Sequence, residues 1–147
     1  KEILNNKELS EKLKGYNLAK KEFFTLKTIN GEFNAWILKP TNFDPNKEYP
    51  LFMTQYSGPG SQSVSNRWNS ANDYWYQYLT EQGYIIVCVD GRGTGFKGAE
   101  FKKVTYKELG KYEVMDQIES AKELGKRPYI NESEIGIWGW SYGGFRS

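Results

Sequence analysis

The sequence contains no histidine and only one cysteine, Cys88, among its 147 residues. The absence of histidine excludes histidine-ligated metal sites, and it excludes every Ser–His or Cys–His catalytic pair completed within this chain. A single cysteine excludes an intrachain disulfide and a cysteine-based zinc cluster. We therefore expect no metal centre.

The sequence also lacks a strong excess of charge and a long hydrophobic run. Its 20 Lys and Arg oppose 18 Asp and Glu, which leaves a net charge of +2. This balance gives no single-sign field, so we expect no nucleic acid partner. The longest purely apolar run, 85–89, is far too short to span a bilayer. The hydrophobic fraction of 38% and the aromatic fraction of 16% are typical of a folded globular chain.

The first part of the chain predicts an arm followed by a β-hairpin. Residues 1–20 are expected to form an amphipathic helix or arm, with apolar positions at Ile3, Leu4, Leu9 and Leu13. The β-type runs 23–29 and 33–38 are separated by Asn30-Gly31-Glu32. Asn-Gly between two such runs is a strong hairpin signal.

Strands and helices alternate after the hairpin. We predict strands over 51–56, 84–89 and 135–138, with helices over about 71–82 and 106–124. The first helix has Ser70 as its expected N-cap and an apolar stripe of Ala71, Tyr74, Trp75, Tyr78 and Leu79. The second has an apolar face of Leu109, Tyr112, Met115, Ile118 and Ala121. This alternation predicts an α/β fold, with a mostly parallel sheet and helices on both faces.

Residues 139–143, Gly-Trp-Ser-Tyr-Gly, match G-x-S-x-G and follow a predicted strand. In a nucleophile elbow the serine lies on a sharp strand-to-helix turn, where a side chain two residues to either side would clash. This pattern makes Ser141 the candidate nucleophile. The alternative is a glycine-rich turn without catalytic function.

A second glycine cluster, Gly93-Thr94-Gly95-Phe96-Lys97-Gly98, matches G-x-G-x-x-G. Such a motif can bind a dinucleotide pyrophosphate at a helix N-terminus. Three residues separate the strand from the first glycine, however, and 101–105 is a poor helix opening. We therefore predict a structural loop, anchored by hydrogen bonds from Arg92, and no cofactor.

Tyr56 lies where the 51–56 strand ends, at the sheet edge where α/β proteins bind ligands. The hydroxyl group of Tyr56 is a candidate oxyanion donor. The alternative is a tyrosine that plugs the top of the sheet. Four other aromatic residues are predicted to pack in the core and between helices: Trp68, Trp75, Tyr76 and Tyr78.

Three strings occur in a fixed order: Tyr56-Ser57-Gly58-Pro59-Gly60-Ser61-Gln62, Asp90-Gly91-Arg92-Gly93-Thr94-Gly95 and Gly139-Trp140-Ser141-Tyr142-Gly143-Gly144. Together they resemble the catalytic domain of the prolyl oligopeptidase family, and within it the dipeptidyl peptidase IV branch. The resemblance implies a partial α/β-hydrolase fold and a serine exopeptidase that releases N-terminal dipeptides or tripeptides after proline or alanine. It implies that Ser141 is the nucleophile. It also implies that the backbone N–H of Tyr142 and the hydroxyl of Tyr56 form the oxyanion hole.

The resemblance also implies what these residues do not contain. Hydrolase triads run in the order Ser, Asp, His, so both partners of Ser141 are expected beyond residue 147. Residues 1–20 are then an arm leading from a β-propeller domain, and 21–147 are the first part of the hydrolase domain. Such a fragment is expected to be inactive by itself. Membership of the family makes a homodimer plausible, together with a periplasmic, membrane-associated or secreted location, although the sequence does not determine the location.

Two other functions stay open at this point. An elbow serine also serves esterases and acyl transferases with the α/β-hydrolase fold, although the His-Gly-Gly-Gly loop of many such enzymes is absent. A non-catalytic binding domain that retains the fold is the third possibility.

Overall fold

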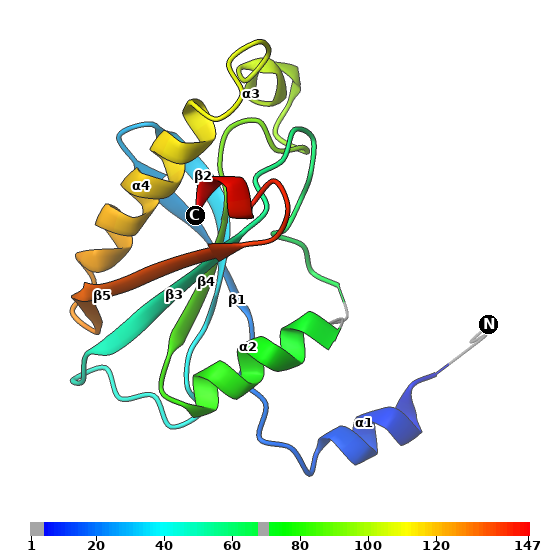
Figure 1. The fold of residues 1–147 in the computed structure, drawn as a ribbon. Helices are drawn as coiled ribbons and strands as arrows, with labels where there is room; N and C mark the ends of the chain where they lie inside the picture. The colour runs from blue at the N-terminus through cyan, green and yellow to red at the C-terminus, as the bar shows by residue number, and fades with distance from the viewer. Residues whose placement is uncertain (1–4, 68–70) are drawn as a thin grey trace.

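The computed structural model describes residues 5–67 and 71–147, in which five strands form one sheet between helices (Figure 1). The strand order across the sheet is β1-β2-β4-β3-β5. The strands are β1 (Glu22–Thr28), β2 (Gly31–Leu38), β3 (Tyr49–Gln55), β4 (Ile85–Asp90) and β5 (Ile130–Gly139). The β1–β2 and β2–β4 pairs are antiparallel, and β3 is parallel to both β4 and β5. The predicted α/β fold, with an N-terminal hairpin and then parallel strands, is confirmed.

The hairpin turn lies slightly earlier than predicted. Thr28 pairs with Gly31, so the two connecting residues are Ile29 and Asn30. Gly31 has a φ of +136°, a conformation that L-residues rarely adopt, and it opens β2. The glycine of the Asn-Gly signal therefore belongs to the strand end.

Helices cover both faces of the sheet, as predicted (Figure 1). Successive side chains of β4 point alternately to the two faces of the sheet. Ile85, Val87 and Val89 pack in the core on the side of α4 (Tyr112–Gly125), which contributes Leu124. Ile86 and Cys88 pack on the other side, against Tyr76 of α2 (Ala71–Glu81). The continuous apolar run is thus a strand buried on both faces.

The apolar stripe predicted for α2 is wrong in part. Three of its members are about half exposed: Tyr74 (48%), Trp75 (51%) and Tyr78 (51%). The helix instead buries Tyr76 and Gln77, and Gln77 binds the backbone N–H and C=O of Ala19. The rings of Trp75 and Tyr78 stack on each other in solvent, at a centroid distance of 5.6 Å. Ser70, Trp68 and the side chain of Ala71 lie outside what the structure describes.

The helix predicted to begin at 106 begins instead at Tyr112. Residues 106–111 form turns in which Lys107 and Gly110 have φ of +61° and +93°, which no α-helix accommodates. A short helix that was not predicted, α3 (Ala99–Lys103), precedes these turns.

The predicted apolar face of α4 is also wrong in part, although Ala121 does pack against the core. Met115 and Ile118 are 44% and 49% exposed, and Leu109, which precedes the helix, is 59% exposed. The buried face of α4 is mostly polar and consists of Glu113, Asp116, Gln117, Ser120 and Leu124. Glu113, Asp116 and Gln117 can face the core here because they bind backbone and side-chain groups at the sheet edge.

The N-terminal arm contains the short helix α1 (Lys7–Leu13), whose residues are all exposed or half-buried. Ile3 and Leu4 lie outside the described residues. The chain ends in a 3-10 turn over Gly144–Arg146. Within residues 5–67 and 71–147, the helices are all too short or too polar to cross a membrane.

Candidate functional site

Ser141 lies at the carboxyl end of β5 in a strained turn. Its φ is +55°, in the left-handed region that non-glycine residues rarely occupy, and its side chain is exposed. A backbone conformation of this kind costs about 1–3 kcal/mol and persists only where the surrounding structure fixes it. Strain of this kind at an exposed serine between a strand and a helical turn is what a nucleophile elbow requires.

The two outer glycines of the motif allow the turn to close on itself. A Cβ atom on Gly139 would lie 2.3 Å from the carbonyl carbon of Gly143. A Cβ atom on Gly143 would lie 2.3 Å from the carbonyl oxygen of Gln55 on β3. Both contacts are with backbone atoms, which cannot easily move away. The structure therefore leaves no room for a side chain at either position, as the motif requires.

Gln55 holds the elbow from the neighbouring strand. Its Nε2 donates a 2.7 Å hydrogen bond to the carbonyl oxygen of Gly143, and the side chain is 4% exposed. Gln55 also pairs with Gly139 in the parallel β3–β5 ladder. Sequence reasoning did not find Gln55, since a buried glutamine at a strand end has no distinctive pattern; its position next to Tyr56 was the only available hint.

Tyr56 and Tyr142, the two predicted oxyanion residues, lie close together. Their ring centroids are 6.1 Å apart, with an angle of 43° between the ring planes. Tyr56 is 40% exposed, whereas Tyr142 is half-buried. The structure thus brings Tyr56, Tyr142 and the elbow serine to the same edge of the sheet, and their catalytic roles stay predictions.

A buried glutamate, which the sequence analysis did not single out as functional, lies behind Tyr142. The hydroxyl of Tyr142 donates a hydrogen bond of 3.1 Å to Oε1 of Glu113, whose side chain is fully buried. The other carboxyl oxygen of Glu113 accepts the backbone N–H of Gly110, also at 3.1 Å. Glu113 therefore joins the first turn of α4 to the elbow.

The loop that follows Tyr56 is fixed by Asp90 at the end of β4. The carboxyl group of Asp90 accepts the backbone N–H groups of Ser63 and Val64, at 3.0 and 2.8 Å. Burial raises the pKa of Asp90, and the two backbone hydrogen bonds partly oppose that rise. Asp90 is therefore a buried residue that holds the loop in place, and its carboxyl group is not exposed to solvent.

The glycine loop 91–98 is held internally and does not form a phosphate cradle. The N–H of Gly93 donates to the carbonyl oxygen of Phe101 at 2.9 Å, and the N–H of Gly95 donates to Ser61 at 2.8 Å. Donors that bind a pyrophosphate would have to face a ligand instead. Arg92 anchors the loop as predicted, because its backbone N–H and its guanidinium group both bind the buried carboxyl group of Asp116.

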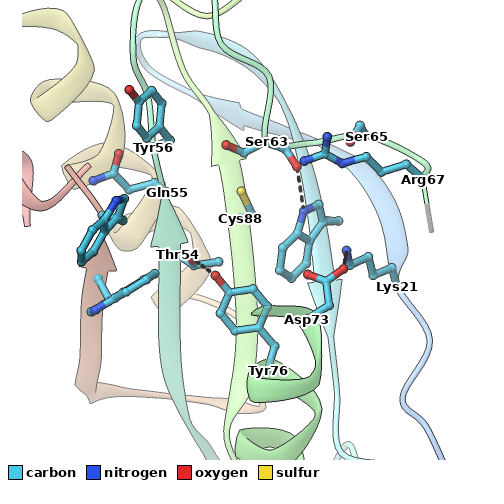
Figure 2. A pocket seen from close by; sticks show the side chains of 13 residues that line it. Lys21, Thr54, Gln55, Tyr56, Ser63, Ser65, Arg67, Asp73, Tyr76 and Cys88 are labelled. Atoms are coloured by element: carbon cyan, nitrogen blue, oxygen red, sulfur yellow. Dashed lines mark hydrogen bonds and ion pairs between the residues drawn. The ribbon is translucent and has the colours of Figure 1, made fainter. Parts of the chain in front are cut away.

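A cavity of about 540 Å³ opens beside Tyr56 on the α2 side of the sheet (Figure 2). Aromatic side chains form much of its wall, including Tyr56, Tyr76, Trp138 and Trp140. Thr54 and Tyr76 join across it by a 2.7 Å hydrogen bond, and an ion pair between Lys21 and Asp73 at 2.8 Å closes its far end. The hollow offers an aromatic surface next to the candidate oxyanion tyrosine.

Metal binding has no support in the described part of the chain. Among residues 5–67 and 71–147, no group of three or more Cys, Asp or Glu side chains is arranged to hold an ion. The acidic residues near the elbow, Glu113 and Asp116, already bind Tyr142 and Arg92.

Comparisons with known proteins agree on one family. The family described as "Prolyl oligopeptidase family" matches residues 65–147, more than half of the chain. "Dipeptidyl peptidase 4" of Trichophyton equinum is 47% identical over 149 residues, which cover 99% of this chain and 19% of that protein. A "Probable dipeptidyl-aminopeptidase B" of Uncinocarpus reesii is 46% identical over 144 residues, covering 97% of this chain and 15% of that protein.

The solved structures give the same result. The crystal structure of Porphyromonas gingivalis dipeptidyl peptidase 4 matches with a TM-score of 0.92 and 49% sequence identity. The match covers 98% of this chain and 20% of that one. The chain therefore spans about a fifth of the length of the relatives that it matches.

Proposed function

Because the chain belongs to the prolyl oligopeptidase family, we propose that it carries the nucleophile and the oxyanion hole of a serine exopeptidase. The enzyme would release N-terminal dipeptides, or tripeptides, from peptides that have proline or alanine before the cleaved bond. The names of the relatives support a dipeptidyl peptidase in particular. The observation that carries the proposal is the position of Ser141. This residue is exposed and has a strained backbone, and it lies beside Tyr56 in a turn that Gly139 and Gly143 allow to close.

In the proposed reaction, Oγ of Ser141 attacks the carbonyl carbon of the scissile bond, and its proton passes to a general base. The carbonyl oxygen becomes negatively charged and is bound by the N–H of Tyr142 and the hydroxyl of Tyr56. The base then returns the proton to the leaving amine, and water hydrolyses the acyl-enzyme. Removing one oxyanion donor typically slows such a reaction by about 10²–10³-fold.

The general base is proposed to be a histidine from polypeptide outside these residues. The 147 residues contain no histidine, and a serine hydroxyl without an adjacent base is a weak nucleophile. The acidic member of a Ser–Asp–His triad and the groups that bind the substrate's amino terminus are also proposed to lie elsewhere in the complete protein. The 147-residue chain by itself is therefore expected to hydrolyse no Gly-Pro chromogenic amide.

The test is covalent labelling of the natural protein that carries this sequence, with a dipeptidyl phosphonate and peptide mapping. We expect the label on Ser141 and none in the Ser141→Ala variant. Ser133→Ala is the matched control, because Ser133 lies on the exposed part of β5 and its hydroxyl binds only a neighbouring side chain, that of Asn131, among the contacts described. A label on another residue, or peptidase activity that survives Ser141→Ala, would contradict the proposal.

Substrate class can be decided on the same protein. Hydrolysis of Gly-Pro and Ala-Pro amides in preference to p-nitrophenyl acetate is expected for the exopeptidase. The reverse preference would favour an esterase with the same elbow serine, and labelling without turnover would favour a binding domain. The homodimer implied by the resemblance also stays a prediction, and sedimentation of the natural protein would test it.

A further inference from the structure

Glu113 is an unusual residue to find in the core of this domain. Its side chain is fully buried on the sheet-facing side of α4, although glutamate is rarely buried unless it is paired. Burial of a polar group has to be compensated by hydrogen bonds. The described bonds of Glu113 lead to Gly110, in the turn before its own helix, and to Tyr142, in the elbow.

We infer that Glu113 is a positioning residue for the oxyanion hole: it fixes the Tyr142 phenol and, through the Tyr142 ring, the ring of Tyr56. This inference rests on the function proposed above. It assigns no contact between Glu113 and the substrate. It says that one buried carboxyl group sets the place of both oxyanion donors.

The side chain of Tyr142 is held at its hydroxyl and on its ring. This residue follows the nucleophile directly, so its backbone N–H and its side chain belong to the same strained turn. The 3.1 Å bond to Glu113 holds the end of the side chain, and ring contacts hold its sides, with Tyr56 at 6.1 Å and Phe145 at 6.5 Å. A change of the Tyr142 rotamer would therefore break the bond to Glu113 and both ring contacts.

The ring of Tyr56 packs against that of Tyr142 and also lies close to Gly58, where a Cβ atom would lie only 2.3 Å from Cε1 of Tyr56. The position of the Tyr56 hydroxyl therefore depends on where the Tyr142 ring lies. If the Tyr142 phenol is released, both donors lose their fixed geometry.

Both oxygens of Glu113 accept hydrogen bonds, one from a hydroxyl and one from a backbone N–H. Glutamine has the same shape, but only one of its two terminal atoms accepts, and the other is an NH₂ donor. Glu113→Gln therefore places its NH₂ donor either against the N–H of Gly110, which cannot accept, or against the Tyr142 hydroxyl, which would have to turn from donor to acceptor; the volume changes little.

The test uses the natural protein that carries this sequence and four variants: Glu113→Gln, Tyr142→Phe, the double variant and Glu123→Gln. Glu123 is the matched control, because it lies on the same helix and makes a surface ion pair with Lys126. Each protein is assayed for kcat and KM on a Gly-Pro amide and for the rate of Ser141 labelling by a fluorophosphonate, a general probe of serine hydrolases.

We expect Glu113→Gln to lower kcat and the labelling rate by about 10–100-fold, less than the loss for a deleted oxyanion donor. KM should change by less than about threefold, since binding of the substrate does not involve Glu113. Tyr142→Phe should lower kcat and the labelling rate by a similar factor. The double variant should be no slower than the slower of the two single variants, because both changes break the same bond. Glu123→Gln should match the wild type.

Two results would overturn the inference while the proposed function stands. One is a Glu113→Gln variant whose kcat and labelling rate stay within about twofold of the wild type. The other is a double variant in which the two losses multiply. If Glu113→Gln fails to fold, Tyr142→Phe decides alone, because it leaves the carboxyl group in place: an unchanged kcat would refute the role. A wild-type protein in which Ser141 is not labelled would refute the function and the inference together.

Discussion

Gly143→Ala tests whether close packing at the elbow, rather than glycine flexibility, is what the motif needs. The added Cβ would lie 2.3 Å from the backbone oxygen of Gln55 and 3.1 Å from the Cα atoms of Gly139 and Tyr56. Ordinary contact begins at 3.4 Å, so the first of these atom pairs has to separate by 1.1 Å, the difference between 3.4 and 2.3 Å. The φ of residue 143 is −63°, which suits alanine, so the backbone conformation itself carries no penalty.

The size of the effect of Gly143→Ala depends on which atoms the new methyl group displaces. Overpacking of a close-packed region costs about 1–3 kcal/mol, and the displaced atoms here belong to the strand end that carries Tyr56. A displacement of about 1 Å in a catalytic arrangement can reduce the rate by about 10²-fold. We therefore expect Gly143→Ala to lower the free energy of unfolding by about 3 kcal/mol and the Ser141 labelling rate by about 100-fold.

The matched control is Gly136→Ala, three residues before the elbow on the same strand. In the described part of the chain, no atom lies within 4 Å of a Cβ added there. Gly-to-Ala changes at such positions stabilise by about 0.4–1 kcal/mol, through the unfolded state. Urea unfolding followed by tryptophan fluorescence, together with fluorophosphonate labelling of the natural protein, measures both effects. Equal stabilities and equal labelling rates for the two variants would refute the packing argument.

Two further predictions concern buried groups away from the elbow. Asp116→Asn should destabilise the protein by about 2–4 kcal/mol in urea unfolding, because it breaks the buried pair that anchors Arg92; a loss below about 0.5 kcal/mol would show that the pair is dispensable. The Cys88 thiol should not react with a thiol reagent at pH 8 until the protein unfolds, because it is buried and desolvation raises its pKa well above 9.0. Since the folded pKa is the higher one, stability should fall as the pH rises above about 9, where the unfolded thiol ionises. Stoichiometric labelling of the folded protein at pH 8 would contradict the prediction that the Cys88 thiol is unreactive.

The sheet and the elbow were predictable because their signals are local. Asn30-Gly31 marks a hairpin, the run 85–89 marks a strand buried on both faces, and G-x-S-x-G requires a tight turn whatever surrounds it. Each of these features depends on the residues themselves and on their nearest neighbours in sequence. The structure contains all three, and only the hairpin turn is displaced, to Ile29 and Asn30.

The helix faces were not predictable from apolar periodicity. The apolar stripes of α2 and α4 leave Trp75, Tyr78, Met115 and Ile118 about half exposed, whereas polar residues face the sheet. A hydrophobic stripe identifies the buried face only where the core beneath the helix is apolar. At the carboxyl edge of this sheet the neighbours of α4 are loops, whose backbone and charged groups need hydrogen-bond partners. Those partners come from distant segments, which the sequence pattern of one helix does not contain.

The polar face of α4 gives a physical reason for this failure that also bears on function. Glu113 holds the elbow through Tyr142, and Asp116 holds the glycine loop through Arg92. One helical turn after Glu113, Gln117 binds the backbone oxygen of Val89 and the hydroxyl of Ser57 in the loop after Tyr56.

These three side chains, at positions 113, 116 and 117, have the spacing of one helix face. Each binds a different loop at the edge where Ser141 and Tyr56 lie. An apolar face could pack against the strands but could not hold three loops in register. The donors that Glu113 and Asp116 accept, and the oxygens to which Gln117 donates, would then lack partners. The polar face that the apolar stripe concealed from the prediction is therefore the one that α4 needs to position the candidate site.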